Sequence, residues 1–123
     1  MNNFSNCIES LNSLKSYLNY VKTEFEAEGT RNEELSILKS IVGSASTDLV
    51  VKIGGAHALR DVLQSHTLSA VSTLVPMIET KEAMKSFIAR RDTLKGDIQK
   101  LPSFMINIET ISSINNIFTI LDL

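Results

Sequence analysis

Short apolar runs alternate along the chain with longer segments in which apolar residues recur every three or four positions. The clearest case is the stretch 48–61, which reads DLVVKIGGAHALRD. Its apolar run LVV is typical of a strand that is buried on both faces, and Lys52 leads from that strand into a two-glycine turn. A helical pattern follows immediately. This stretch therefore predicts a strand, a turn and a helix in direct succession.

Three other strands follow from the same kind of pattern. Residues 20–26 alternate between polar and apolar side chains, which places Lys22, Glu24 and Glu26 on a solvated face. Two further runs predict the remaining strands, at residues 70–75, where Pro76 ends the pattern, and 103–108.

Helices are predicted between these strands and at both ends of the chain. Thr30 and Glu33 have the spacing of a capping box, Gly43 is a plausible stop for the helix that they begin, and Thr80 can cap a later helix. A packing helix is expected over about residues 5–17. The buried stripes expected for the other helices are Leu35, Leu38, Ile41 and Val42; Ala58, Leu59, Val62 and Leu63; Ala83, Met84, Phe87 and Ile88; and Ile111, Ile114, Ile117, Phe118 and Leu121.

The resulting order is one helix followed by four strand-helix units. Strict alternation of this kind predicts an α/β fold with a parallel sheet and right-handed crossovers. Two architectures fit the order: an open doubly wound sheet, or four units of a TIM (β/α)8 barrel, which would be half of such a barrel. Residues 1–123 would form one complete small domain in the first case and a single partial barrel domain in the second.

Composition limits the possible partners and locations. The 123 residues are 43% hydrophobic, which is enough for one core, and the formal net charge of -2 argues against nucleic acid as a partner. The chain shows neither a signal-peptide pattern nor an apolar run near the roughly 18 residues of a membrane span, so we expect a soluble, cytoplasmic protein that does not enter the membrane. Cys7 is alone, which excludes a disulfide framework.

Ionisable residues recur where the predicted strands end. Because parallel strands bring their carboxyl ends to one edge of a sheet, these groups could share a rim, and oxygen-rich sites suit Mg²⁺ or Mn²⁺. The alternative is that acidic residues simply favour helix starts. The residues at the four strand ends are Glu26 and Glu28; Lys52, Gly54 and Gly55; Met77 and Glu79; and Glu109 and Thr110.

Four segments at these ends carry a resemblance to a known family. They read FEAEGTR at 25–31, KIGGAHALRD at 52–61, PMIETKEAMKSFI at 76–88 and NIETISSINNI at 107–117. In this order and spacing they resemble the HpcH/HpaI aldolase/citrate lyase family, in particular a branch with a Lys-Ile-Gly-Gly turn. The resemblance implies a TIM barrel that uses a divalent metal to cleave or form a carbon-carbon bond next to an oxo acid.

The same resemblance assigns roles residue by residue. Glu109 matches the family's metal-ligand glutamate, and Glu79 matches an acidic position that lines the same site. Lys52 stands where well-studied members have an arginine that contacts the substrate, and it keeps the charge without the planar fork. The remaining candidates are Gly54 and Gly55, whose amides could bind an anion, and the rim acids Glu26 and Glu28.

Two departures from the family pattern shape the expectation. Gly29 stands where aldolase-type members have a histidine base, and the family's second metal-ligand aspartate would lie beyond Leu123. We therefore expect a truncated or split lyase that acts on a 2-oxo acid or related carboxylate and that pairs as a homo-oligomer or with a complementary C-terminal half. The alternative is a catalytically silent half-barrel that serves as an assembly or binding module.

Overall fold

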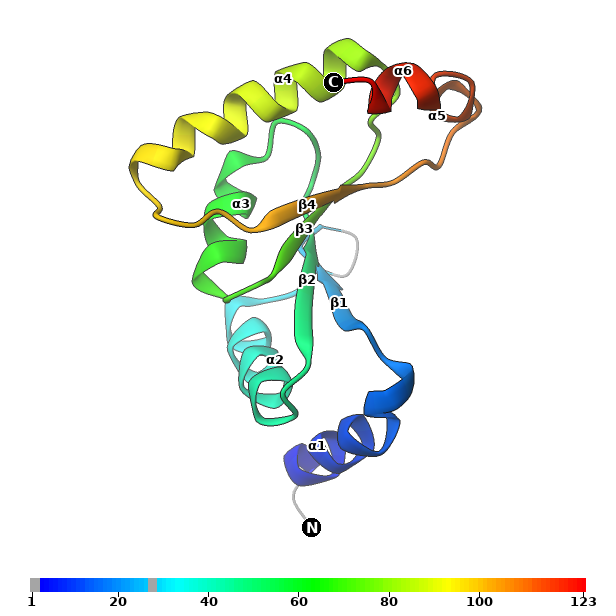
Figure 1. The fold of residues 1–123 in the computed structure, drawn as a ribbon. Helices are drawn as coiled ribbons and strands as arrows, with labels where there is room; N and C mark the ends of the chain where they lie inside the picture. The colour runs from blue at the N-terminus through cyan, green and yellow to red at the C-terminus, as the bar shows by residue number, and fades with distance from the viewer. Residues whose placement is uncertain (1–2, 27–28) are drawn as a thin grey trace.

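A computed structural model describes residues 3–26 and 29–123 and contains one parallel four-stranded sheet (Figure 1). The strand order is β1-β2-β3-β4, so each strand pairs with the strand that precedes it in sequence. The predicted α/β class with alternating helices and parallel strands is confirmed. The strands are β1 (Tyr20–Glu24), β2 (Asp48–Lys52), β3 (Ser72–Val75) and β4 (Ser103–Ile106).

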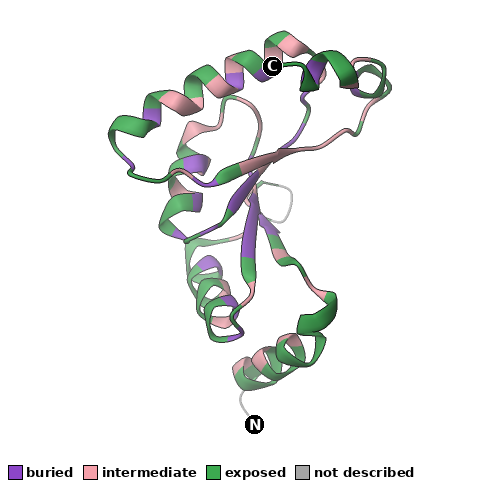
Figure 2. Ribbon diagram, in the orientation of Figure 1, coloured by how far each residue is buried: buried purple, intermediate pink, exposed green. Residues whose placement is uncertain are grey.

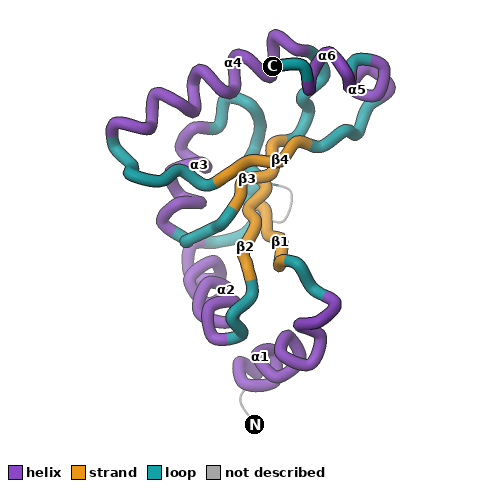
Figure 3. Tube along the Cα trace, in the orientation of Figure 1, coloured by secondary structure: helices purple, strands orange, loops and turns teal. Residues whose placement is uncertain are grey.

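Helical segments precede, separate and follow these strands (Figure 3). No helix in residues 3–26 and 29–123 is long and apolar enough to cross a membrane. The helical segments are α1 (Asn3–Leu14), the 3-10 turn η1 (Lys15–Tyr17), α2 (Asn32–Ser44), α3 (Leu59–Thr67), α4 (Lys81–Asp92), the 3-10 turn η2 (Thr93–Gly96), α5 (Ile111–Asn115) and α6 (Ile117–Leu121).

One face of the sheet packs against helices α2, α3 and α4. Leu49 and Val51 of β2 share a buried cluster with Leu35 of α2. Ile53, just after β2, shares a second cluster with Val62 of α3, and that cluster also includes residues of α4 and α6. Because these β2 positions alternate with Val50 and Lys52, all three helices cover the same face of the sheet.

This arrangement follows from the strand order. Right-handed crossovers keep helices on one face as long as the order runs in one direction, whereas a doubly wound sheet needs a reversal. The order β1-β2-β3-β4 has no reversal. The four described strands therefore do not form a doubly wound sheet.

The stretch 48–61 forms the predicted strand, but its helix begins later than predicted. Leu49, Val50 and Val51 are all buried, so β2 is covered on both faces (Figure 2). The helix α3 begins only at Leu59, after a turn in which Gly55 adopts a φ of 154° that favours glycine.

The first strand is shorter than predicted, and the alternating pattern gave the wrong exposure for Glu24. β1 ends at Glu24, and Glu24 is buried although its spacing predicted a solvated face. The predicted capping box is wrong by one residue, because the backbone N–H of Arg31 donates to Glu34. Thr30 instead donates its hydroxyl proton to the carbonyl oxygen of Glu24.

Several helical predictions hold, while others fail. The Thr80 cap is confirmed by a 3.1 Å hydrogen bond from the Ala83 N–H, and α4 buries Met84 and Phe87 as predicted. The expected burial of Leu63 in α3 is wrong, because that side chain is exposed. The helix α1 packs against α2, and none of its residues Asn3–Leu14 is buried.

The last predicted stripe is also wrong. Asn116 interrupts the helix, and its side-chain amide donates to the carbonyl oxygen of Glu79. The periodicity therefore does not continue across the break. Ile120, which the stripe omitted, is fully buried, whereas most of the predicted stripe is exposed, namely Ile111, Ile114, Phe118 and Leu121.

Candidate functional site

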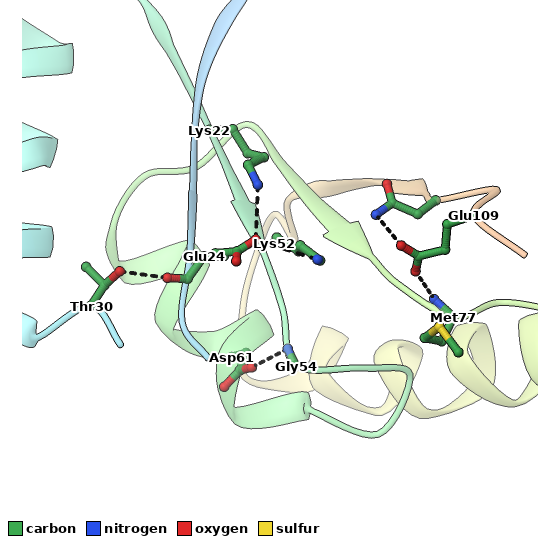
Figure 4. A network of polar contacts seen from close by, with 9 residues as sticks. Lys22, Glu24, Thr30, Lys52, Gly54, Asp61, Met77 and Glu109 are labelled. Carbon is green, nitrogen blue, oxygen red and sulfur yellow. Dashed lines mark hydrogen bonds and ion pairs between the residues drawn. The ribbon is translucent and has the colours of Figure 1, made fainter. Parts of the chain in front are cut away.

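The carboxyl ends of the strands carry the charged residues that the sequence singled out. Lys52 is the last residue of β2, and parallel pairing aligns it with Glu24 at the end of β1. Glu109 follows β4 and reaches the loop after β3 (Figure 4). Lys52 and Glu109 thus lie at the same end of the sheet, where the carboxyl ends of the strands are, as their positions in the sequence predicted.

Glu24 sits between two lysines. Its Oε2 lies 3.0 Å from the Nζ of Lys22 and 3.6 Å from the Nζ of Lys52. The Glu24 side chain is only 10% exposed, whereas both lysines are open enough to meet solvent. A buried carboxylate therefore positions two partly exposed ammonium groups on the face opposite the helices.

This arrangement sets the protonation of Glu24. The hydrogen bond from Lys22 holds the pKa of the Glu24 carboxyl below its ordinary value of 4.5, and the charges of Lys22 and Lys52 act in the same direction. Burial opposes them by disfavouring the charged form. The net effect keeps Glu24 ionised at neutral pH, so it can hold the ammonium group of Lys52 in place.

The glycine turn has a different role from the one that the motif suggested. The Gly54 N–H donates to Oδ2 of Asp61 at 2.8 Å, so this amide is not free to bind an anion. The carboxylate of Glu26 lies directly against Gly54, where a Cβ would force it to move. A small cavity of about 90 Å³ opens here, and it is lined by Glu24, Glu26, Lys52, Ile53, Gly54 and Pro76.

Glu109 links two loops. Its Oε1 accepts the Met77 N–H at 2.9 Å, and its Oε2 lies 3.5 Å from the side-chain amide of Asn107. Met77 has a φ of 58°, an uncommon conformation for a residue with a side chain, and the bond to Glu109 stabilises it. Glu109 therefore has a structural role in addition to any role as a ligand.

The donor set does not by itself make a metal site. Within residues 3–26 and 29–123, no group of three or more histidine, cysteine, aspartate or glutamate side chains is arranged to hold an ion. Protein-bound Mg²⁺ uses one or two carboxylates together with several waters. Glu109 could supply one such carboxylate, and the described side chains around it do not complete the set.

The other predicted residues are more scattered. Glu79 is half-buried in the loop before α4, and Glu28 lies outside the described residues. Sequence reasoning missed Lys22, Glu24 and Asp61. Glu24 pairs with both Lys22 and Lys52, and Asp61 accepts the N–H of Gly54 in the glycine turn. The alternation in β1 contained a signal for two of them, because it put Lys22 and Glu24 on one face.

Comparison with known proteins adds no assignment to this geometry. No model of a known protein family matches the chain, and no curated protein matches it as a relative.

Proposed function

We propose that the chain forms four units of a (β/α)8 barrel whose rim binds a 2-oxo acid or related small carboxylate, as part of a carbon-carbon lyase of the aldolase/citrate lyase kind. The uninterrupted strand order and the helices on a single face support the barrel part of this proposal. The motifs that contain Lys52 and Glu109 support the activity.

The observation that carries the proposal is the placement of Lys52. Its ammonium group lies at the carboxyl end of β2, beside a cavity, and the buried Glu24 holds it there. In barrels of this kind the chemistry occurs at that end of the strands. An ammonium fixed by a buried carboxylate can bind the carboxylate of a substrate and orient it without first losing side-chain freedom.

The cavity limits the size of the group that enters it. Its volume of about 90 Å³ is well below the ~300–1,000 Å³ of pockets for drug-sized ligands. A carboxylate or carbonyl group fits such a space. This favours a small acid as the ligand.

Glu109 is the one residue that we assign to Mg²⁺ or Mn²⁺ as a ligand. When bound, such an ion would stabilise negative charge on a substrate oxygen. The described residues supply an incomplete donor set for such an ion.

Thermal unfolding in the presence of Mg²⁺ and pyruvate tests the proposal, because a ligand that binds only the folded state raises the melting temperature. We expect a rise for the wild type, and no rise for Lys52→Gln or Glu109→Gln. Glutamine at position 109 keeps a carbonyl oxygen for the Met77 N–H, so this variant should remain as stable as the wild type, whereas Glu109→Ala should lose about 1 kcal/mol.

Glu33→Gln, a change at an exposed residue of α2, is the control and should respond like the wild type. A folded wild-type protein whose melting temperature does not change with Mg²⁺ and pyruvate would contradict the proposal.

A specific observation favours a second function, that of an assembly module. Large apolar side chains of α5 and α6 are exposed, and exposed apolar surface can serve in association. Self-association that survives EDTA and the Glu109→Gln change, in a protein that binds no acid, would favour this second function.

A further inference from the structure

Lys52 is the one lysine among the described residues whose side chain lines the cavity at the carboxyl end of β2. The side chain is 26% exposed, so its amine is partly withdrawn from solvent and is still accessible to a small molecule. Ile53 and Pro76, two buried apolar residues, form another part of the cavity wall. A lysine amine in such a place can react with a carbonyl group that enters the cavity.

Glu24 gives this amine a proton acceptor at close range. Its Oε2 lies 3.6 Å from the Nζ of Lys52, and the Glu24 side chain is only 10% exposed. The same oxygen accepts a hydrogen bond of 3.0 Å from the Nζ of Lys22 (Figure 4). One carboxylate is therefore shared by two ammonium groups and cannot neutralise both.

These contacts match the needs of a lysine nucleophile. Enzymes that use a lysine amine to attack a carbonyl group withdraw it from solvent or place it next to another cationic group. Lys52 has Lys22 as the second cation, because both ammonium groups contact the same oxygen of Glu24. The arrangement thus combines a nucleophile, a proton acceptor and a neighbouring positive charge at the carboxyl end of the sheet.

We propose that Lys52 forms an imine with the carbonyl carbon of a 2-oxo acid, so that this residue bonds to the substrate as well as anchoring it. The imine rests on the proposed function, which supplies the 2-oxo acid. In such an acid the carbonyl carbon is bonded directly to the carboxylate, so an amine that contacts the carboxylate lies next to that carbon. Arginine could hold the carboxylate, but it stays protonated and cannot take this step.

The step balances in atoms and charge. Glu24 takes one proton from the Lys52 ammonium group, and the nitrogen lone pair then attacks the carbonyl carbon while the π electrons move to oxygen. That oxygen receives one proton from the nitrogen and one from Glu24, and it leaves as water. The product is an iminium with one positive charge, like the original ammonium, so Glu24 returns to a carboxylate and keeps its partner. The iminium can accept the electron pair that is released when a bond to the adjacent carbon breaks, which is what a carbon-carbon lyase requires.

Reductive trapping with pyruvate and sodium cyanoborohydride tests the imine, because this reagent converts an imine into a stable amine. In EDTA, peptide mass spectrometry should find the adduct on Lys52 in about tenfold or greater excess over Lys22 and Lys95. Lys22 shares the Glu24 partner and is 40% exposed, but it does not line the cavity. Lys95 also pairs with a carboxylate, at 2.8 Å from Asp92, and is 62% exposed. Equal labelling of the three lysines, or no adduct on Lys52, would overturn the proposal.

Three variants assign the roles of Lys52 and Glu24. Lys52→Arg keeps the positive charge beside Glu24, so it should keep the circular dichroism spectrum and the rise in melting temperature with Mg²⁺ and pyruvate, but it should form no adduct at position 52. Glu24→Gln removes the proton acceptor and should slow the labelling of Lys52 by about a hundredfold, while Lys95 is labelled as in the wild type. Glu24→Asp keeps a carboxylate and should recover part of the rate. Labelling of Lys52 at the wild-type rate in Glu24→Gln would refute the role of Glu24.

These outcomes separate the imine from the proposed function. A rise in melting temperature with Mg²⁺ and pyruvate, without an adduct on Lys52, would overturn the imine and leave Lys52 as an anchor in the proposed lyase. An adduct on Lys52 in EDTA, with no such rise, would support the imine and count against the part of Mg²⁺. A folded protein that shows neither would contradict both.

Discussion

Replacing Phe87 with alanine should cost the protein a large part of its stability. Phe87 lies on α4, has no exposed surface, and packs in the cluster that joins α3, α4 and α6 to the sheet. Its ring meets Phe104 of β4 edge to face, with centroids 5.2 Å apart and an interplanar angle of 78°. The Phe87→Ala change removes this contact and leaves a cavity between the helix layer and the sheet.

The expected size follows from those contacts. A buried phenylalanine truncated to alanine loses about 3–5 kcal/mol, which includes ~0.5–1.5 kcal/mol for an edge-to-face aromatic pair. The whole free energy of unfolding of a domain is only ~5–15 kcal/mol. A loss of about 4 kcal/mol would therefore leave the variant close to unfolding at room temperature.

Urea unfolding followed by circular dichroism measures the loss. With a slope of about 2 kcal/mol per molar urea, the midpoint should fall by about 2 M. Phe118→Ala makes the same chemical change at an exposed position, and should stay within about 0.5 kcal/mol of the wild type. A loss below about 1 kcal/mol for Phe87→Ala, or equal losses for the two variants, would refute the packing described for this core.

Two further predictions concern the rim and a helix start. The pKa of the Glu24 carboxyl is lowered in the folded protein, so its contribution to stability is full above pH 4.5 and is lost as the pH falls through the folded pKa. The difference in melting temperature between the wild type and Glu24→Gln should therefore shrink on the acid side of pH 4.5. A difference that stays constant with pH would argue against the pairing of Glu24 with the lysines. Thr80→Ala should cost about 1 kcal/mol in urea unfolding through loss of the Ala83 hydrogen bond, while Thr80→Ser should keep most of it, and equal losses would argue against the cap.

The parts of the fold that were predictable depend on short-range patterns. The run Leu49 to Val51 is enough to indicate a fully buried strand, and Thr80 is enough to indicate a helix start. The end of the last helix was not predictable in this way. Asn116 breaks the helix because its amide donates to the carbonyl oxygen of Glu79, which is far away in sequence.

In the candidate site, too, the features that depend on short-range patterns were predictable and those that depend on distant contacts were not. The positions of Lys52 and Glu109 at strand ends follow from the strand pattern, and the structure places both at one edge of the sheet. The burial of Glu24 does not follow, because it depends on pairing with Lys52 across two strands. The contact of Glu109 with Met77 likewise requires β3 and β4 to be adjacent. Sequence alone therefore indicated the rim without its internal contacts.

The strand order also has a consequence for how the chain folds. Each strand pairs with its immediate predecessor, so no later segment has to insert between two strands that have already paired. The sheet can grow one unit at a time from β1, in the direction in which a ribosome releases the chain. Each pairing must still close a loop that contains a whole helix, as between Tyr20 and Asp48, and this loop closure slows the folding of parallel sheets. At every stage of synthesis, the newest strand is an open edge that offers its amides and carbonyls to the strand that emerges next.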